Sequence, residues 1–274
     1  MKGVLPISFG PELVWIWSRD LKKHIGKRVR KLEGGDSWVA VSVSGNAVLL
    51  LSWGAKNCGI AVISDKEKKD LIASAKQAPP IVNALKSNIS GAELTDVCQL
   101  NRDRIIRLTF TKTIGAGFSN TRHLTLEMME RYSNLIFTDE NNTVLETAKH
   151  IHPADNRFRS VLPGHPYSMP PEFNGIPLED WLQHPSSETL RSVAGFGKKL
   201  LERLSGMEAE RTARCLNGFY KNETDTSPYA PQMIKIYLTA LPELLEGASP
   251  LPDTTVTDTG HLAVLSPIAD VSIN

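Results

Sequence analysis

Cysteine is scarce in this 274-residue chain, and the three that occur, Cys58, Cys98 and Cys215, lie far apart. No CxxC pair is present, which argues against a disulfide framework and against a zinc knuckle. No apolar run is long enough to cross a membrane, so we expect no membrane partner. The N-terminus has no small-residue cleavage site before the charged stretch at residues 19–23, and we therefore expect mature sequence and a cytoplasmic location.

An excess of charge is also lacking, because 31 Lys and Arg stand against 30 Asp and Glu, for a formal net charge of +1. No global positive field therefore attracts nucleic acid, and any polyanion site must come from locally clustered Lys and Arg. The length is sufficient for one large domain or two modest ones.

Motifs of catalysis are missing as well. The chain contains no GxSxG, no P-loop, no HExxH and no paired metal-ligand spacing. The seven histidines are scattered, which favours hydrogen-bonded or solvated roles over metal ligation. We therefore expect a non-enzymatic protein with no catalytic residue, no metal and no cofactor.

The first half of the chain alternates helical and strand patterns. A helix is predicted over residues 11–24, and a solvated loop or helix start over the charged stretch at 65–70. A second helix is predicted over residues 81–89, opened by two prolines. Strands are predicted over residues 27–32, 38–43, 47–52, 58–63, 91–100, 103–112, 123–129, 134–138 and 143–149, with a glycine-containing loop over 113–120. The order helix, sheet, helix, sheet is an α+β pattern.

The second half is mainly helical. Residues 152–177 are rich in proline and polar residues and are predicted to form a linker or a long ordered loop. Helices are predicted over residues 178–184, 187–193, 198–204, 208–221 and 231–246, and two short strands in the tail around Thr259 and Gly260.

Two predicted helices, 187–193 and 198–204, are joined by the turn Ala194-Gly195-Phe196-Gly197. This arrangement resembles a helix-hairpin-helix, in which backbone N–H groups, helped by Lys198 and Lys199, can bind a phosphate. A tight turn in a helical bundle with solvated lysines is the alternative, and this segment alone slightly favours it.

The densest positive cluster spans the end of the first predicted helix and the strand after it. Its phosphate-contact candidates are Lys22, Lys23, Lys27, Arg28 and Arg30. A run of charges is more often a solvated surface, so the cluster alone is weak support for nucleic-acid binding.

The pair Asp103-Arg104 enters a predicted strand. An aspartate could orient the arginine and leave its planar fork for phosphate or base contacts. From these residues alone, a structural salt bridge at the strand start is the better interpretation.

Several segments taken together resemble the N-terminal module of the NFACT family, also called the fibronectin-binding protein A N-terminal domain. The resemblance is carried by order and spacing, and it is strongest over residues 94–171. The segments are QLNRDRIIRL at 99–108, LTLEMMERYSNLIFTDE at 124–140, VLETAKHI at 144–151 and the pattern R-x-V-L-P-G-x-x-Y-x-x-P-P from Arg159 to Pro171.

The resemblance implies a fold of two domains and a tail. Residues 1–172 would form an α+β domain with a mixed sheet, similar to the N-terminal domain of the formamidopyrimidine-DNA glycosylases. Residues 173–247 would form a helical domain with the helix-hairpin-helix, and residues 248–274 a tail that returns as short strands.

The resemblance also implies a function. Full-length relatives act in ribosome-associated quality control, where they bind tRNA and the large ribosomal subunit carrying peptidyl-tRNA and support untemplated alanine tailing. The family's Asp-Arg pair, implicated in tRNA handling, maps onto Asp103 and Arg104. Arg131 is a second tRNA-binding candidate. Two departures are that Glu130 and Tyr132 replace a family Gly and His, and that the helix at 81–89 lacks the family's basic positions.

Three other functions are alternatives to this one. Adhesion to fibronectin, suggested by the older family name, is disfavoured by the absence of a signal peptide, an anchor and disulfides. Base excision is disfavoured because the chain begins Met1-Lys2-Gly3-Val4, without the N-terminal proline of the glycosylases. A protein-interaction scaffold would show no salt-dependent RNA binding.

Overall fold

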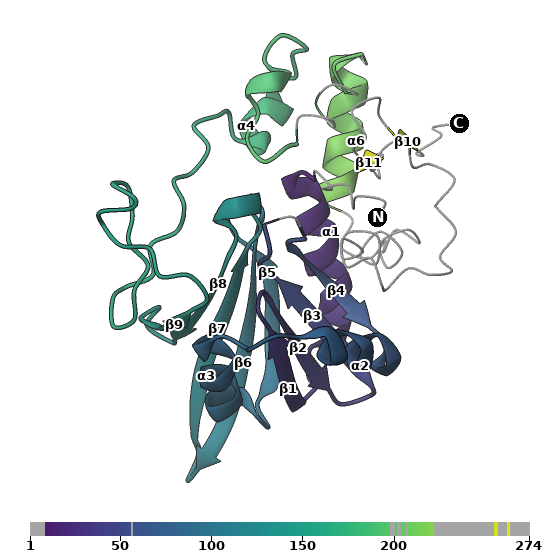
Figure 1. Ribbon diagram of the computed structural model, residues 1–274. Coiled ribbons are helices and arrows are strands. Elements are labelled where there is room, and N and C mark those ends of the chain that lie inside the picture. The colour runs from purple at the N-terminus through teal and green to yellow at the C-terminus, as the bar shows by residue number, and fades with distance from the viewer. Residues whose placement is uncertain are drawn as a thin grey trace.

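The computed structural model describes residues 9–55, 57–197, 201, 204–206, 208–221, 255–256 and 262–263. Two antiparallel sheets and the helices between them form the larger part of the molecule, and a smaller helical part stands above one end of the sheets (Figure 1). The α+β class predicted from the sequence is confirmed.

The first helix and the first sheet follow the predicted pattern. Helix α1 (Pro11–Leu21) has proline in its first turn, where the missing N–H costs nothing, and continues as the 3₁₀ turn η1 (Lys22–His24). Strands β1 (Val29–Gly35), β2 (Trp38–Val43), β3 (Ala47–Ser52) and β4 (Gly59–Ile63) pair in chain order.

Two helices connect the sheets. The charged stretch at 65–70 belongs to helix α2 (Asp65–Ser74), because Ser64 and Glu67 form a reciprocal capping box at its start. Helix α3 (Pro80–Ile89) begins at the second of the two prolines and buries Ile81, Val82, Leu85 and Ile89. The helix predicted for residues 81–89 is confirmed.

The second sheet contains β5 (Glu93–Gln99), β6 (Ile105–Gly115), β7 (Phe118–Glu127), β8 (Asn134–Asp139) and β9 (Val144–Thr147), with the 3₁₀ turn η2 (Glu130–Tyr132) before β8. The mixed sheet expected from the resemblance is wrong. Every pairing in both sheets is antiparallel, because short turns join most successive strands and the longer connections are not parallel crossovers.

The loop predicted for residues 113–120 is also wrong. Strands β6 and β7 remain paired through Thr113↔Ser119 and Gly115↔Phe118. Gly115, Ala116 and Gly117 all have positive φ, so the chain reverses within a very short turn.

One core joins the two sheets. Buried side chains from α1, α3 and both sheets form a single apolar cluster that includes Trp17, Leu50, Phe110 and Phe137. The start of the first sheet also meets the second sheet, since Arg28 and Glu93 form an antiparallel bridge and the preceding Gly26 N–H donates to Leu94 O at 2.8 Å. This continuous core fixes the end of the second sheet relative to the start of α1.

Residues 152–177 form a long irregular segment that returns to the second sheet through bridges such as Ile151↔Val161. The helical part contains α4 (Leu178–Gln183), the 3₁₀ turn η3 (Leu190–Ser192) and α6 (Ala209–Lys221). It has its own apolar cluster of Leu178, Trp181, Leu190, Val193, Leu204 and Leu216. The domain boundaries at 172 and 247 stay predictions.

The helix predicted for residues 187–193 is wrong, because only η3 forms there. Trp181 Nε1 donates to Ser186 O and lies 3.1 Å from Thr189 Oγ1, and Val193 is extended and bridges Ile176 in parallel. A helix-hairpin-helix is therefore not seen in the described residues, and Lys198 and Lys199 lie outside them. The likeness to the glycosylase domain stays a prediction.

The two short strands predicted in the tail are confirmed as β10 (Thr255–Val256) and β11 (Leu262–Ala263), which pair antiparallel. The helix predicted over residues 231–246 lies outside the described residues. No helix in the described ranges is long and apolar enough to span a membrane.

Candidate functional site

The turn between β5 and β6 is a type I′ turn. Asn101 and Arg102 occupy its two central positions with φ of 52° and 49°, and Asp103 N–H donates to Leu100 O at 2.9 Å. The side chain of Gln99 supports the turn, since Nε2 donates to the carbonyls of Asp103 and Pro11, each at 2.8 Å. The turn is thereby tied to the first residue of α1.

Asp103 acts on the backbone of Arg104. Its Oδ1 accepts the Arg104 backbone N–H at 2.6 Å. Among the described residues, the Arg104 guanidinium makes no ion pair within 4.0 Å, so the salt bridge suggested by the adjacent pair does not form. The aspartate holds the chain while the arginine fork stays available for a ligand.

Arg102 connects the same turn to the helical part. Its guanidinium pairs with Glu179 of α4 and lies over the ring of Tyr220 of α6, 5.2 Å from the ring centroid. Gly195 packs against it so closely that an added Cβ would lie 2.8 Å from Arg102 Cβ. The two arginines of the motif thus have different roles, since Arg102 is ion-paired within the chain and Arg104 has no ion pair among the described residues.

A second link joins α1 to the turn at residues 194–197, the glycine turn. The buried Glu12 carboxylate accepts the Gly197 N–H at 2.9 Å. Burial raises the pKa of Glu12, and the hydrogen bond from Gly197 and the nearby charge of Arg104 oppose that rise. The start of α1 and the turn at 194–197 are therefore packed as one unit.

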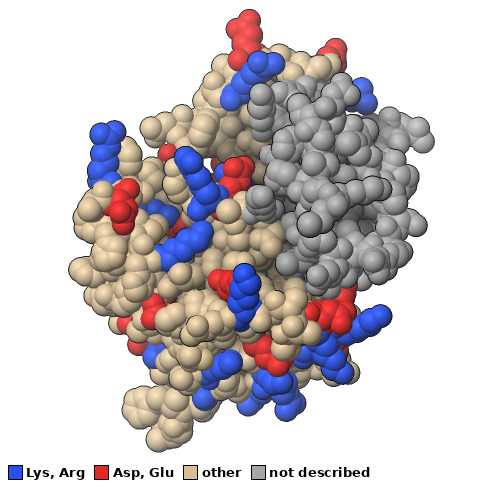
Figure 2. Space-filling view, viewed as in Figure 1, with Lys and Arg blue, Asp and Glu red and all other residues tan. Residues whose placement is uncertain are grey.

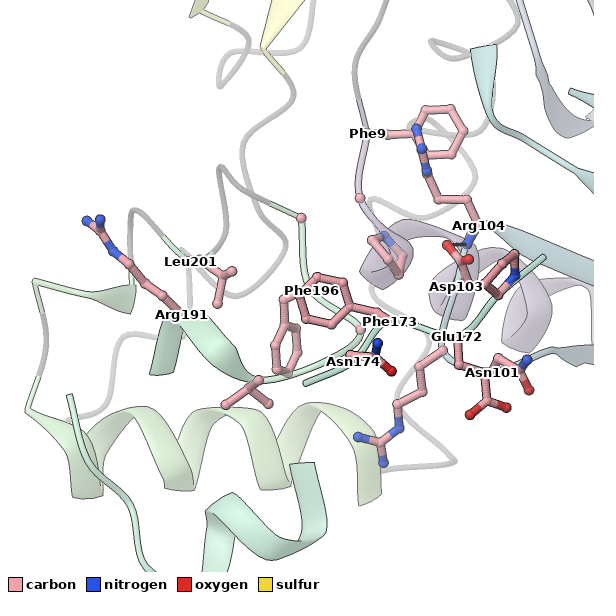
Figure 3. A pocket seen from close by; sticks show the side chains of 17 residues that line it. Phe9, Asn101, Asp103, Arg104, Glu172, Phe173, Asn174, Arg191, Phe196 and Leu201 are labelled. Atoms are coloured by element: carbon pink, nitrogen blue, oxygen red, sulfur yellow. Dashed lines mark hydrogen bonds between the residues drawn. The ribbon is translucent and has the colours of Figure 1, made fainter. Parts of the chain in front are cut away.

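These contacts enclose an open pocket of about 770 Å³ between the β5–β6 turn and the helical part. Figure 3 shows Phe9 with Arg104 on one side of it, and Phe173 and Phe196 towards the other. Its lining is Phe9, Gly10, Pro11, Asn101, Arg102, Asp103, Arg104, Pro171, Glu172, Phe173, Asn174, Arg191, Val193, Gly195, Phe196, Gly197 and Leu201.

The pocket combines aromatic surface with arginine charge. Arg104 and Arg191 are not neutralised by an ion pair within the described residues, whereas Arg102 is bound to Glu179. Glu172 adds an opposing charge at the exposed rim. Flat aromatic faces beside unpaired arginines are suited to nucleotides, whose bases stack and whose phosphates pair with guanidinium groups.

The structure thus brings together two sequence-predicted sites, the Asp103-Arg104 pair and the turn 194–197. Sequence reasoning missed Glu12, Phe173, Asn174 and Arg191. No local sequence signal marked these residues. Glu12 is an acid at the start of a helix, Phe173 and Asn174 lie in a proline-rich segment, and Arg191 is a lone arginine, and such residues are common on ordinary surfaces.

Arg131 lies in η2, at the same end of the second sheet as Arg104. Its guanidinium donates to Tyr132 Oη at 2.7 Å and lies over that ring. The neighbouring Asn134 is buried, and its side chain binds the backbone of Leu135 and Lys149. Arg131 therefore stays a surface candidate, whereas Asn134 is structural.

The motif arginine and tyrosine after β9 also have a structural role. Arg159 pairs with both oxygens of the fully buried Glu127, at 2.7 and 2.6 Å, and Tyr167 Oη donates to the same carboxylate at 2.8 Å. Burial and the Glu127 charge both raise the pKa of Tyr167. This network anchors the segment that carries Phe173 into the pocket.

The basic cluster lies elsewhere. Lys22 begins η1 at the far end of α1, about 15 Å along the helix from Pro11. Three members have partners within the chain: Lys23 with Asp20 at 2.7 Å, Lys27 with His24 Nδ1 at 3.0 Å, and Arg28 with Glu93 at 4.0 Å. Lys22 and Arg30 are exposed. The cluster is not part of the pocket.

Charge is mixed over the face drawn in Figure 2, where Lys and Arg alternate with Asp and Glu over the described surface. This agrees with the near-zero net charge of the chain. Any attraction to a polyanion therefore depends on a few unpaired cations rather than on a broad field.

Comparison with known proteins adds sequence relatives. The chain is 32% identical to the Rqc2 homolog RqcH of Bacillus subtilis over 137 residues, 48% of this chain and 23% of that protein. It is 24% identical to the Rqc2 homolog RqcH of Streptococcus pneumoniae over 160 residues, 54% of this chain and 29% of that protein. The match thus spans about a quarter of the length of these relatives.

Solved structures share the fold. The N-terminal part of the fibronectin/fibrinogen-binding protein from Streptococcus suis has a TM-score of 0.66 at 22% identity, covering 78% of this chain and 85% of that one. The fibrinogen-binding protein from Staphylococcus aureus has a TM-score of 0.61 at 19% identity, covering 95% and 92%.

A family match covers most of the chain. Residues 20–247 match the family described as NFACT N-terminal and middle domains. This span includes both sheets, the β5–β6 turn, α2, α3 and the described helices of the helical part, but only the end of α1. The chain therefore belongs to the NFACT family.

Proposed function

We propose that this protein is the RNA-binding module of a ribosome-associated quality control factor. In this role it binds tRNA, together with the large ribosomal subunit that carries peptidyl-tRNA, during rescue of stalled nascent chains. The activity is recognition without catalysis. Its sequence relatives named Rqc2 homolog RqcH support the assignment, and the module would act in the cytoplasm.

The observation that carries the proposal is the unpaired fork of Arg104 at the aromatic pocket. Asp103 fixes the Arg104 backbone, and Arg102 and Glu12 fix the opposite wall. The backbone that carries the fork and the wall that faces it are thus held in place before a ligand binds. A guanidinium in this position pairs with phosphate, and Phe173 and Phe196 supply stacking surfaces for a base.

The test is titration of labelled tRNA against the 274-residue protein and its Arg104→Ala variant across a series of salt concentrations. Wild type should bind with a steep salt dependence, because phosphate contacts release counterions. Arg104→Ala should weaken binding at every salt concentration and lower the salt slope by about one. Arg104→Lys should recover the charge but only part of the affinity, because an ammonium lacks the two-pronged fork.

The matched control is Lys86→Ala. Lys86 is an exposed cation on α3, away from the pocket, and its removal changes the net charge by the same amount. Its affinity for tRNA should stay near that of wild type. Equal losses in Arg104→Ala and Lys86→Ala would mean that only overall charge matters, and absence of salt-dependent binding by wild type would refute the RNA-binding function.

A second candidate function is binding of fibronectin or fibrinogen, because the structural relatives carry those names. Surface plasmon resonance with immobilised fibronectin would detect it. Binding there that is unaffected by Arg104→Ala, in a protein that ignores tRNA, would favour this candidate.

A further inference from the structure

The hairpin of β6 and β7 extends beyond the rest of its sheet. Pairing with β5 ends at Glu93↔Thr111, and pairing with β8 ends at Arg122↔Asp139. Residues 112–121 therefore form a two-stranded arm with no sheet neighbour on either side, and this arm projects at the lower left of Figure 1. It points away from the end of the sheet that carries Arg104.

The tip of the arm is apolar and exposed. Ile114 is 62% exposed and Phe118 is 70% exposed, and they flank the turn at residues 115–117. In Figure 2 this end of the molecule is a projection without charged side chains. Large apolar side chains held on a projecting tip mark a contact with another molecule.

The strands that form the arm contain cations and, up to residue 126, no acids of their own. From Ile105 to Leu126 the sequence contains no Asp or Glu, while it contains Arg107, Lys112 and Arg122. The neighbouring strands place acids beside this hairpin outside the arm, since Glu93 and Asp96 lie opposite Thr111 and Thr109, and Asp139 lies opposite Arg122. The positive charge without a neighbouring acid is therefore confined to the arm, where residues 112–121 carry Lys112 and no Asp or Glu, and this suits a polyanion partner.

Hydroxyl groups line the outer surface of the same strands. Thr111 Oγ1 lies 3.1 Å from Thr95 Oγ1 and 3.5 Å from Thr121 Oγ1. Hydroxyls and amides of this kind bind phosphate oxygens and ribose hydroxyls without reading sequence. Because successive pairs point to opposite faces, Thr111 and Thr121 lie on the face opposite Lys112, so the arm offers an apolar tip, one cation and, on its other face, neutral hydroxyls.

We infer that this arm is a second RNA-contact surface, in which Phe118 stacks on an unpaired base and Lys112 pairs with a neighbouring phosphate. Exposed aromatic side chains on strands bind single-stranded or looped RNA in this way. The inference rests on the proposed function and extends it. Along β6, the arm lies about 30 Å from Arg104, so the two surfaces contact different RNA segments, tRNA at the pocket and ribosomal RNA at the arm.

An apolar tip alone would also suit a cleft in a protein. The arm favours RNA over that alternative, because residues 112–121 carry the cation Lys112 and no acid, whereas a protein cleft that takes Ile114 and Phe118 does not require a cation. Site-specific crosslinking distinguishes an RNA partner from a protein partner.

The experiment places p-benzoylphenylalanine at position 118 of the 274-residue chain and irradiates it with purified large ribosomal subunits. The expected adduct loses its mobility shift on RNase treatment and keeps it when the ribosomal proteins are digested. In parallel, Ile114→Ser/Phe118→Ser should lower subunit affinity in a sedimentation assay by about tenfold, the loss expected from one stacked base. Affinity for free tRNA should not change.

The matched control is Phe158→Ser, because Phe158 is 71% exposed but lies on the irregular segment 152–177. It should bind subunits as wild type does. Adducts confined to ribosomal protein or to a second copy of this chain, unchanged subunit binding by the double variant, or no subunit binding by wild type would each overturn the inference. Loss of tRNA binding by Arg104→Ala is measured separately, so failure of the arm and failure of the proposed function are distinguishable.

Discussion

Arg102 of the β5–β6 turn pairs with Glu179 of α4, 77 positions later in the chain. The same guanidinium lies over the ring of Tyr220. One side chain therefore links the sheet domain to two helices of the helical part, and it stands two residues before the arginine that faces the pocket. The geometry of the pocket depends on this link.

Replacing Arg102 by alanine should destabilise the protein and weaken tRNA binding. The ion pair is partly exposed, at 32% and 67%, and is worth at most about 1 kcal/mol after solvent screening. The contact with Tyr220 adds roughly 0.5–1 kcal/mol. Urea unfolding should show a loss of about 1–2 kcal/mol for Arg102→Ala and less than about 1 kcal/mol for Glu179→Ala. Equal losses in the two variants would show that the ring contact contributes nothing.

Replacing Gly195 by alanine should add a steric clash to the cost of left-handed backbone strain, and Gly164→Ala measures the strain alone. Gly195 has φ of +88° and an added Cβ would lie 2.8 Å from Arg102 Cβ, whereas Gly164 has φ of +81° and open space around it. Gly164→Ala should cost only the left-handed strain of about 1–2 kcal/mol. Gly195→Ala should cost roughly 1–3 kcal/mol more, from overpacking, and should also reduce tRNA affinity. Thermal unfolding of the two variants measures the difference, and equal costs would contradict the close packing.

Removing the charge of Glu127 should be among the most damaging single changes. Glu127→Gln leaves Arg159 buried, at 7% exposure, without its anionic partner. Breaking one side of a buried pair costs about 3–5 kcal/mol. Guanidinium unfolding should show this loss, whereas the double variant Glu127→Leu/Arg159→Met should recover most of it. A mild effect of Glu127→Gln would mean that water reaches the arginine.

The free energy of unfolding should fall as the pH is lowered from 6.5 towards 4, because of His24. Burial, reinforced by the charges of Lys27 and Lys23, lowers the pKa of His24 from 6.5 to about 4. The unfolded chain then binds the proton more readily, so the contribution of neutral His24 is complete above pH 6.5 and is lost as the pH falls towards 4.

The variant His24→Asn isolates this contribution, because its amide oxygen can replace Nδ1 as the acceptor for Lys27. Unfolding free energy should depend less on pH between 6.5 and 4 in the variant than in wild type. Identical pH profiles would assign the acid sensitivity to other groups, and His123→Asn is the comparison, since burial lowers the pKa of His123 as well.

Most of the elements could be predicted from the sequence, because local patterns determine them. Strands 38–43 and 47–52 are apolar runs joined by the turn residues Ser44-Gly45-Asn46, and both are found with those bounds. The wrong predictions lie where a local sequence signal indicated a different structure from the one that forms. Gly115 and Gly117 indicated a loop, but antiparallel partners extended both strands almost to the turn.

The sequence by itself determined the α+β class, the order of the elements and the family resemblance, since each depends on hydrophobic period and motif spacing along the chain. It also identified Asp103, Arg104 and the glycine turn as separate candidates. Only the tertiary structure decided that they share one pocket, that Arg102 is an internal link and that the basic cluster lies apart. Those outcomes depend on contacts between Glu12 and Gly197 or Arg102 and Tyr220, which no local pattern records because they arise when distant segments pack together.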